Sequence, residues 1–183
     1  VKEGTLVVEN THAQPFSWFK FIVRETWGNC NAQLQELALY DAAGNRINLN
    51  LSERDAGTAA SALRPGEFAC GGTYAYPSVT EKADRLFDDD PTTKVCFGGL
   101  QPKADWTMPE SRIIVMRLPD GAAKVASYNF RTAGTETQAK FARRRPVTWT
   151  LESSFDGENW ALADEQVNAG HPTENASVWY NGG

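Results

Sequence analysis

Apolar and polar residues alternate along two stretches near the start of the chain. Phe19, Phe21 and Val23 occupy every second position, a period that is typical of a strand with one buried face. Residues 33–40 have the same character and lead into the sequence Asp-Ala-Ala-Gly-Asn at residues 41–45, which favours a turn. We therefore expect two strands in this part of the chain.

Three more strands are predicted in the second half. Residues 112–118 are apolar and rich in β-branched side chains, and residues 125–131 carry two aromatic residues in an extended pattern. Residues 147–151 alternate between large apolar side chains and threonine. β-Branched and aromatic residues fit the pleated, half-buried surface of a sheet, so these stretches are predicted to be core strands.

A hairpin is predicted after the last of these strands. Asp156 and Gly157 tolerate positive φ, and they separate the strand of Trp149 from a stretch that carries Trp160 and Leu162. Such a pair reverses the chain in a tight turn. We assign both tryptophans to the core, because large aromatic residues on paired strands are most often buried.

One short helix is indicated. Ser78 and Glu81 follow Pro77 with the spacing of a capping box, and the helix would run to about residue 87. Few other stretches sustain a helical period. The predicted fold class is therefore all-β, a jelly-roll β-sandwich with one or two short helices.

Length and composition agree with a globular fold. The 183 residues suffice for one full-sized core, so we expect a single domain over residues 1–183 with its core at about 16–167. Hydrophobic residues make up 41% and charged residues 22% of the chain, which argues against disorder. No apolar run approaches the roughly 20 residues needed to cross a bilayer.

The charge disfavours nucleic acid as a partner. The formal net charge is −5, whereas nucleic-acid-binding proteins usually present a basic surface. One local exception is the basic cluster of Lys140, Arg143, Arg144 and Arg145. This cluster either contacts an anionic ligand or is a solvated loop.

Neither the cysteines nor the histidines form a catalytic or zinc motif. Cys30, Cys70 and Cys96 have no C-x-x-C spacing and allow at most one disulfide within the chain. The two histidines are His12 and His171, and no G-x-S-x-G, H-E-x-x-H or phosphate-binding glycine motif is present. We therefore expect no enzymatic activity.

Two segments together resemble the discoidin-like superfamily. Residues 85–94 read R-L-F-D-D-D-P-T-T-K, and residues 146–160 read P-V-T-W-T-L-E-S-S-F-D-G-E-N-W. This superfamily, also called the coagulation-factor type C or galactose-binding-domain-like group, includes the family 32 carbohydrate-binding modules of secreted glycoside hydrolases, which the chain resembles most. The resemblance implies a jelly-roll sandwich.

The order of the segments is unusual for this superfamily. Residues 19–24 and 33–40 resemble the strands that usually close such a domain, yet here they come first. The resemblance therefore implies a circularly permuted module, which is reasonable because domain termini often lie close together at the surface. The alternative is that the first part ends one module and the remainder begins another.

The resemblance also implies a structural calcium ion. Calcium takes about six to eight oxygen ligands, and the acidic loop, defined as residues 88–93, offers carboxylate, hydroxyl and carbonyl oxygens. The implied ligands are the Asp88 and Glu36 side chains, the Thr93 hydroxyl and carbonyl, and the carbonyls of Arg85, Asp90 and Gln35. An ion enclosed in this way would stabilise the fold and leave no position for a substrate.

The chain departs from the family pattern at two places. Asp89 stands where the family usually has glycine, and Val95 and Cys96 stand where a tryptophan is common. Aspartate tolerates a left-handed conformation, so the acidic loop can keep its shape. The alternative is that residues 88–90 form only an acidic turn that caps the end of a helix.

Sugar recognition needs an aromatic ring that stacks on the sugar and planar polar groups that bond its hydroxyls. The candidate ligand-binding residues are Tyr74, Tyr76, Trp106, Arg131, Arg143, Arg144, His171 and Trp179. Trp27 and Trp106 could equally cover the ends of the sheets. Arg145, which precedes Pro146, resembles a family position that supports the loop.

The resemblance implies a non-catalytic carbohydrate-binding module that recognises galactose-type glycans. Such a module would be secreted or at the cell surface, joined to other modules of the same polypeptide, and a membrane is not its expected partner. The alternatives are a protein or phospholipid adhesion module and a spacer domain without a soluble ligand. Loop chemistry, rather than the fold, decides among them.

Overall fold

The structure is a computed structural model that describes residues 16–28, 31–71, 81–97, 112–132, 143–169 and 179–181. Its strands are β1 (Trp18–Thr26), β2 (Ala32–Tyr40), β3 (Ser52–Glu53), β4 (Glu67–Cys70), β5 (Val95–Phe97), β6 (Ile113–Arg117), β7 (Ser127–Thr132), β8 (Pro146–Ser154), β9 (Ala161–Gln166) and β10 (Trp179–Asn181). Two 3-10 turns, η1 (Ala60–Ala62) and η2 (Ala83–Leu86), are the helical elements of these residues.

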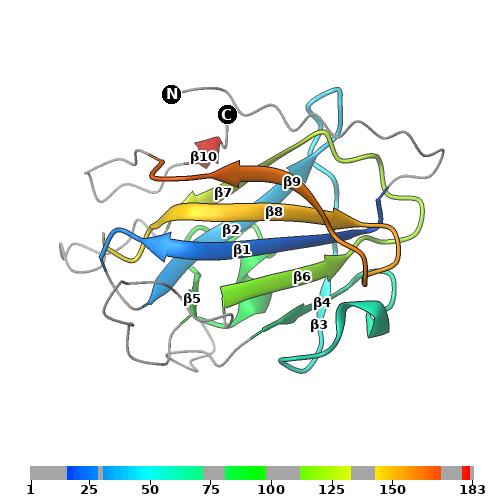
Figure 1. The fold of residues 1–183 in the computed structure, drawn as a ribbon, viewed down its shortest axis with the longest axis horizontal. Helices are drawn as coiled ribbons and strands as arrows, with labels where there is room; N and C mark the ends of the chain where they lie inside the picture. The colour runs from blue at the N-terminus through cyan, green and yellow to red at the C-terminus, as the bar shows by residue number, and fades with distance from the viewer. Residues whose placement is uncertain are drawn as a thin grey trace.

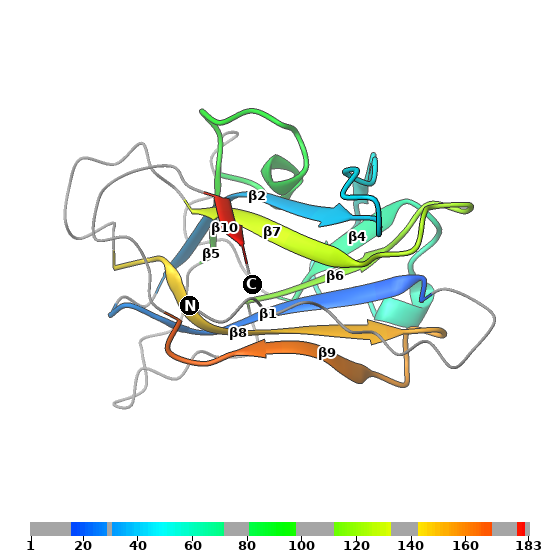
Figure 2. The ribbon, with the colours of Figure 1, turned by 90° about the horizontal axis from the view of Figure 1, so that it is seen from above.

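The strands form two sheets. The six-stranded sheet has the order β3-β4-β6-β1-β8-β9, and the four-stranded sheet has the order β10-β7-β2-β5. Figure 1 looks onto the larger sheet, and Figure 2 shows the two sheets as stacked layers, with β1, β8 and β9 in one and β2 and β7 in the other. The predicted all-β sandwich is confirmed.

Strand β1 lies near the centre of the larger sheet, between β6 and β8. Phe19, Phe21 and Val23 are each at most 1% exposed and belong to the hydrophobic core. Lys20, which an alternating strand places on the other face, donates a 2.7 Å hydrogen bond to Glu152 of β8. The alternation in the sequence therefore identified the buried face of β1 correctly.

Aromatic rings and one polar network join the two sheets. The Phe130 ring of β7 lies edge-on to the Trp149 ring of β8, with centroids 4.9 Å apart, and 5.5 Å from the Phe21 ring of β1. Trp149 Nε1 donates a 2.8 Å hydrogen bond to the Tyr128 hydroxyl, which donates to the Asp164 carboxylate of β9. We call Tyr128, Trp149 and Asp164 the inter-sheet network. It satisfies the buried indole donor, as buried tryptophans require.

The predicted hairpin joins β8 to β9. Gly157 has a φ of +78°, which glycine adopts without strain. The Asp156 carboxylate accepts hydrogen bonds of 2.8 Å from the side chain and backbone of Asn159 and from the backbone of Glu158. These bonds hold the pKa of Asp156 well below its usual range, so the turn stabilises the ionised aspartate.

Trp160 does not belong to the core, so the prediction for this residue is wrong. It precedes β9, one of the two edge strands of the larger sheet, and is half-buried. The Lys20 ammonium lies 4.0 Å from the centre of its ring. A cation over the ring face explains how a large aromatic residue remains at the surface.

The predicted helix is reduced to a single 3-10 turn in the described residues. Its N-cap is Lys82, which makes no side-chain capping hydrogen bond, and Ser78 of the predicted capping box lies outside the described residues. Ala83 and Leu86 are both buried. Side chains three residues apart eclipse in 3-10 geometry, so one turn already places both residues in the core.

Four short strands escaped prediction: β3, β4, β5 and β10. None exceeds four residues, which is too short to display an alternating pattern. Strand β10 pairs with β7 and lies beyond residue 167, where the core was expected to end.

No helix of the described residues is long and apolar enough to cross a membrane.

Candidate metal centre

A β-bulge interrupts β2 where it pairs with β7. Leu34 and Glu36 pair with two adjacent residues of β7, so Gln35 is one extra residue on the β2 side. A bulge changes the face to which the following residues point. The core residues of β2 are consistent with this bulge. Leu34 and Leu37 both belong to the core, although residues three apart would lie on opposite faces of a regular strand.

Gln35 and Glu36 consequently both point away from the core face. They are 1% and 2% exposed, because neighbouring segments cover them. Gln35 donates a 2.7 Å hydrogen bond to the Pro91 carbonyl of the acidic loop, and Glu36 Oε2 accepts a 3.0 Å hydrogen bond from Arg46. The bulge therefore presents an amide and a carboxylate to the segments that cover β2.

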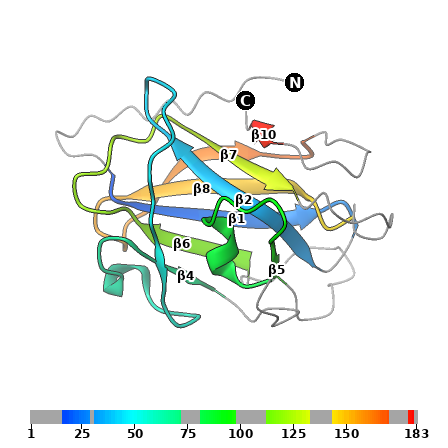
Figure 3. The same ribbon diagram turned by 180° about the vertical axis from the view of Figure 1, so that it is seen from behind.

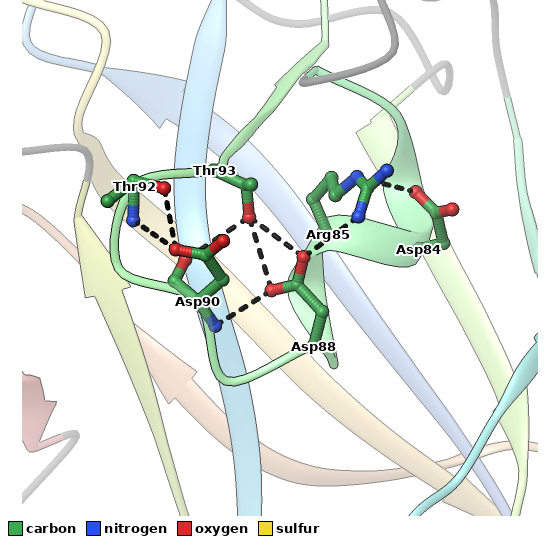
Figure 4. A network of polar contacts seen from close by, with 6 residues as sticks. All are labelled: Asp84, Arg85, Asp88, Asp90, Thr92 and Thr93. Carbon is green, nitrogen blue, oxygen red and sulfur yellow. Dashed lines mark hydrogen bonds and ion pairs between the residues drawn. The ribbon is translucent and has the colours of Figure 1, made fainter.

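The acidic loop is folded around the Asp88 carboxylate (Figure 4). Asp88 Oδ1 accepts a 3.0 Å hydrogen bond from the Asp90 backbone, and Asp90 Oδ1 accepts hydrogen bonds from the Thr92 hydroxyl and backbone at 2.6 and 2.8 Å. The bonds from Thr92 hold the pKa of Asp90 below its usual range. Arg85 lies 3.2 Å from Asp88 Oδ2. These local bonds, which are typical of aspartate turns, bring several oxygens close together.

The Thr93 hydroxyl lies where three acceptor oxygens meet (Figure 4). Thr93 Oγ1 is 3.1 Å from Asp88 Oδ1, 2.9 Å from Asp88 Oδ2 and 3.1 Å from the Asp90 carbonyl oxygen. A hydroxyl has one proton and can donate it to only one of these acceptors at a time. The acceptors also receive hydrogen bonds from the Asp90 backbone, from Arg85 and from the Thr93 backbone. Carboxylate, hydroxyl and carbonyl oxygens, the ligand types that calcium prefers, therefore lie close together.

Asp89 forms the tip of the acidic loop. Its φ is +57°, so the backbone at Asp89 is left-handed. The expectation that aspartate can hold this conformation is confirmed. Its exposed carboxylate forms an ion pair with Arg46.

Arg46, which was not among the predicted site residues, joins Glu36 to Asp89. One guanidinium nitrogen lies 3.0 Å from Glu36 Oε2 and another contacts Asp89. The turn after β2 brings Arg46 to this place, because Asp41 accepts two backbone hydrogen bonds within the turn and Arg46 forms an antiparallel bridge with Tyr40. The turn sequence was the available signal, since a tight reversal returns the chain alongside β2.

Burial raises the pKa of Glu36 to about 7. The Arg46 guanidinium opposes this rise, whereas the carboxylates of Asp89 and Asp88 add to it. Glu36 Oε1 is buried and has no hydrogen-bond partner among the described residues. A buried carboxylate with like charges nearby would be stabilised by further positive charge.

The structure brings together part of the implied ligand set. The Asp88 carboxylate, the Thr93 hydroxyl and the Asp90 carbonyl converge, and Glu36 lies close enough for Asp88 to raise its pKa. The contacts described for Arg85 and Gln35 involve their side chains, not the implied carbonyls. No group of three or more His, Cys, Asp or Glu side chains in the described ranges could hold a metal ion. A cation here would therefore need hydroxyl and carbonyl ligands as well.

The predicted sugar-binding residues lie partly outside the described residues, namely Tyr74, Tyr76, Trp106 and His171. The Trp179 backbone pairs with Arg131 of β7, but its side chain is outside the description. Arg143 is exposed, whereas Arg144 is 8% exposed and lies 3.9 Å from the Cys96 sulfur. A ligand could reach Arg143 more easily than Arg144. The ligand-binding role of these residues stays a prediction.

Two of the cysteines are buried free thiols, Cys70 and Cys96. Burial raises the pKa of both, and that of Cys96 to about 11. Because the thiolate is the reactive form of cysteine, neither thiol is activated as a nucleophile. Cys30 lies outside the described residues.

Comparison with known proteins gives no relative for this chain. No protein-family model, no curated protein and no solved structure matches it. The function must therefore be inferred from the chain's own residues and their geometry.

Proposed function

We propose that the chain is a discoidin-like, circularly permuted binding module without catalytic activity, in which a calcium ion between β2 and the acidic loop stabilises the sandwich. Its ligand is a carbohydrate of the galactose type. The module acts outside the cell, secreted or at the cell surface, as part of a larger polypeptide. One observation carries the proposal: carboxylate, hydroxyl and carbonyl oxygens of the acidic loop converge near Glu36, a buried carboxylate with one oxygen that has no partner among the described residues.

The residues fit a calcium ion in their chemistry. Calcium prefers carboxylate, hydroxyl and carbonyl oxygens. The Asp88 carboxylate and the Asp90 carbonyl lie 2.9 and 3.1 Å from the Thr93 hydroxyl, so one oxygen of each kind is present. The buried Oε1 of Glu36, which has no partner in the described residues, supplies a further oxygen. The positive charge of the ion would offset the negative charges of the Glu36, Asp88 and Asp89 carboxylates.

Arg46 and Gln35 have supporting roles in this proposal. Arg46 holds Glu36 Oε2 at 3.0 Å, which orients the carboxylate while Oε1 remains available for the cation. Gln35 ties β2 to the Pro91 carbonyl within the acidic loop. Groups that orient metal ligands in this way contribute strongly to metal affinity.

The experiment that tests the metal is a thermal unfolding measurement with and without calcium. We expect calcium at about one hundred times its Kd to stabilise the protein by about 2.7 kcal/mol. For a chain of this size the Tm should rise by about 5 to 10 °C. Asp88→Ala should abolish this calcium-dependent rise.

Asp84→Ala is the matched control. Asp84 belongs to η2, pairs with Arg85 and carries the same charge, but it is not among the implied ligands. We expect this variant to keep the full calcium-dependent rise in Tm. If the wild type shows no rise, or if both variants lose it equally, the metal part of the proposal is wrong.

The ligand is tested separately, by calorimetric titration and glycan arrays with neutral and acidic sugars. Binding of galactose or a galactose-containing disaccharide would support the proposed ligand class. Binding to phospholipid vesicles in the absence of sugar binding would favour the adhesion alternative. Silence in both assays, with the calcium response intact, would favour a spacer domain.

A further inference from the structure

A pocket lies next to the candidate metal centre. Its volume is about 460 Å³, and its lining includes Arg46, Asn48, Asn50, Phe87, Asp88 and Asp89. This volume lies within the range of roughly 300–1,000 Å³ that is usual for small-molecule sites. Its walls are the segment that follows β2 and the turn between η2 and the acidic loop. Figure 3 places both of these next to β2.

The lining combines one aromatic ring with planar polar groups. Asn48 and Asn50 are exposed, and an asparagine amide can both donate and accept hydrogen bonds. Phe87 is half-buried, and its ring lies edge-on to Phe68 of β4 at 5.0 Å, so the core fixes its position. An aromatic ring beside amides and carboxylates suits a ligand that has apolar ring carbons and several hydroxyls.

The charges of the pocket disfavour an anionic ligand. The positive charge of Arg46 is already paired with Glu36 and Asp89. Asp88 adds a further carboxylate to the lining. With the proposed calcium ion bound, its two positive charges and that of Arg46 only balance the carboxylates of Glu36, Asp88 and Asp89. The pocket therefore offers no net positive charge to a ligand with a carboxylate, whereas neutral hydroxyls could donate hydrogen bonds to the aspartates.

The backbone is strained on both walls of the pocket. Asn50 has a φ of +39° and Asp89 a φ of +57°, and the third non-glycine residue with positive φ in the described ranges is Asn168. Two of these three residues therefore line one pocket. Left-handed backbone at non-glycine residues costs stability and often accompanies functional sites.

We infer that this pocket is the sugar-binding subsite and that it takes a neutral, hydroxyl-rich sugar, held by the amides of Asn48 and Asn50 and by the ring of Phe87. The inference rests on the proposed function and specifies where the ligand binds. Asp88 belongs both to the metal centre and to the lining of the pocket. Calcium therefore orders one wall of the subsite, and galactose should bind more weakly when calcium is removed.

The test is a calorimetric titration of the full 183-residue chain in calcium with galactose and with galacturonate, which carries a carboxylate in place of the primary alcohol. Galactose should bind at least several-fold more tightly than galacturonate. Asn48→Ala and Asn50→Gly should each weaken galactose binding by about tenfold, since a lost hydrogen bond typically costs this much.

Asn168→Gly is the matched control for Asn50→Gly. Both residues are exposed asparagines with positive φ, so glycine relieves the same kind of strain at either position. The control should bind galactose as the wild type does, and all variants should keep the calcium-dependent rise in Tm, which shows that they fold.

Several outcomes overturn the inference. If galactose binding is unchanged in both Asn48→Ala and Asn50→Gly, the sugar binds elsewhere and the proposed function survives without this subsite. Tighter binding of galacturonate than of galactose would contradict the charge argument. Absence of binding by either sugar, with the calcium response intact, would remove the subsite together with the carbohydrate part of the proposed function.

Discussion

Two buried polar assemblies lie on either side of the four-stranded sheet, and they differ in how well their hydrogen bonds are satisfied. In the inter-sheet network, the Tyr128 hydroxyl both accepts from Trp149 and donates to Asp164. Beside β2, Glu36 has one oxygen bound by Arg46 and one without a partner in the described residues. The first assembly is complete, and the second is not.

This difference in hydrogen bonding distinguishes polar groups that stabilise the fold from polar groups that are candidates for binding. A satisfied buried network stabilises one arrangement of the core, whereas a buried group without a partner costs free energy and calls for an explanation. Burial raises the pKa of Tyr128 far above its usual range, and the hydrogen bond to Asp164 adds to this rise, so its hydroxyl stays neutral. The pKa of Glu36 is raised to about 7. A bound cation or a proton would therefore offset the free-energy cost of burying this carboxylate.

Among changes outside the implied metal ligands, the largest effect is expected for Tyr128→Phe. This change leaves the Trp149 donor and the Asp164 carboxylate without their shared partner, so we expect a loss of about 2 kcal/mol in the free energy of unfolding. Urea denaturation with calcium and with a chelator measures it. The loss should be equal under both conditions, because the network lies away from the candidate metal centre.

Tyr40→Phe serves as the control, since Tyr40 ends β2 and is only half-buried. We expect it to change the free energy of unfolding by less than about 0.5 kcal/mol. If the loss of unfolding free energy in Tyr128→Phe depended on calcium, the two assemblies would be energetically coupled. The distinction between them would then be wrong.

A smaller effect concerns the pH dependence of the metal-free protein. The pKa of Glu36 is about 7 in the folded chain against an ordinary value of 4.5. Between these pH values the folded state holds a proton that the unfolded state has released. Stability in a chelator should therefore fall as pH rises from about 4.5 to 7, by an amount on the order of 1–2 kcal/mol after allowance for screening.

Glu36→Gln removes this titration. The variant should lack the decline between pH 4.5 and 7, and above pH 7 it should be at least as stable as the metal-free wild type. It should also lose most of the calcium-dependent stabilisation. Parallel pH profiles for the two proteins would contradict the assignment of the raised pKa to Glu36.

The smallest effect is expected for Asp89→Gly. Glycine relieves the left-handed strain, which is worth about 1 kcal/mol, but removes an ion pair whose exposed carboxylate contributes between about 0 and 1 kcal/mol. The net change in unfolding free energy should lie within about 1 kcal/mol of zero. The calcium-dependent rise in Tm should persist, and its loss would mean that Asp89 is itself a ligand.

The sequence predicted the long strands because they are long enough for a pattern of apolar residues to appear. The alternation of Phe19, Phe21 and Val23 could be recognised because β1 has nine residues and a clear inner face. The two to four residues of β3, β4, β5 and β10 are too few for a period to appear. These strands form by pairing with the exposed edges of neighbouring strands. The local sequence does not show which distant strand will be the neighbour.

The candidate metal centre was predictable in part. The acidic loop is contiguous in the sequence, so the convergence of Asp88, Asp90 and Thr93 followed from local spacing. Arg46 could not be found in this way, because its contacts depend on how the turn after β2 directs the chain. A signal for the bulge was present, since Leu34 and Leu37 are three residues apart and break the alternation of β2.

The position of β1 has a consequence for folding during synthesis. β1 is made before every other described strand, yet Trp18 pairs on one side with Arg117 and on the other with Ser154. The centre of the larger sheet therefore cannot close until β8 has left the ribosome, and pairings so distant in sequence form slowly. Until then, the apolar face of β1 is available to chaperones.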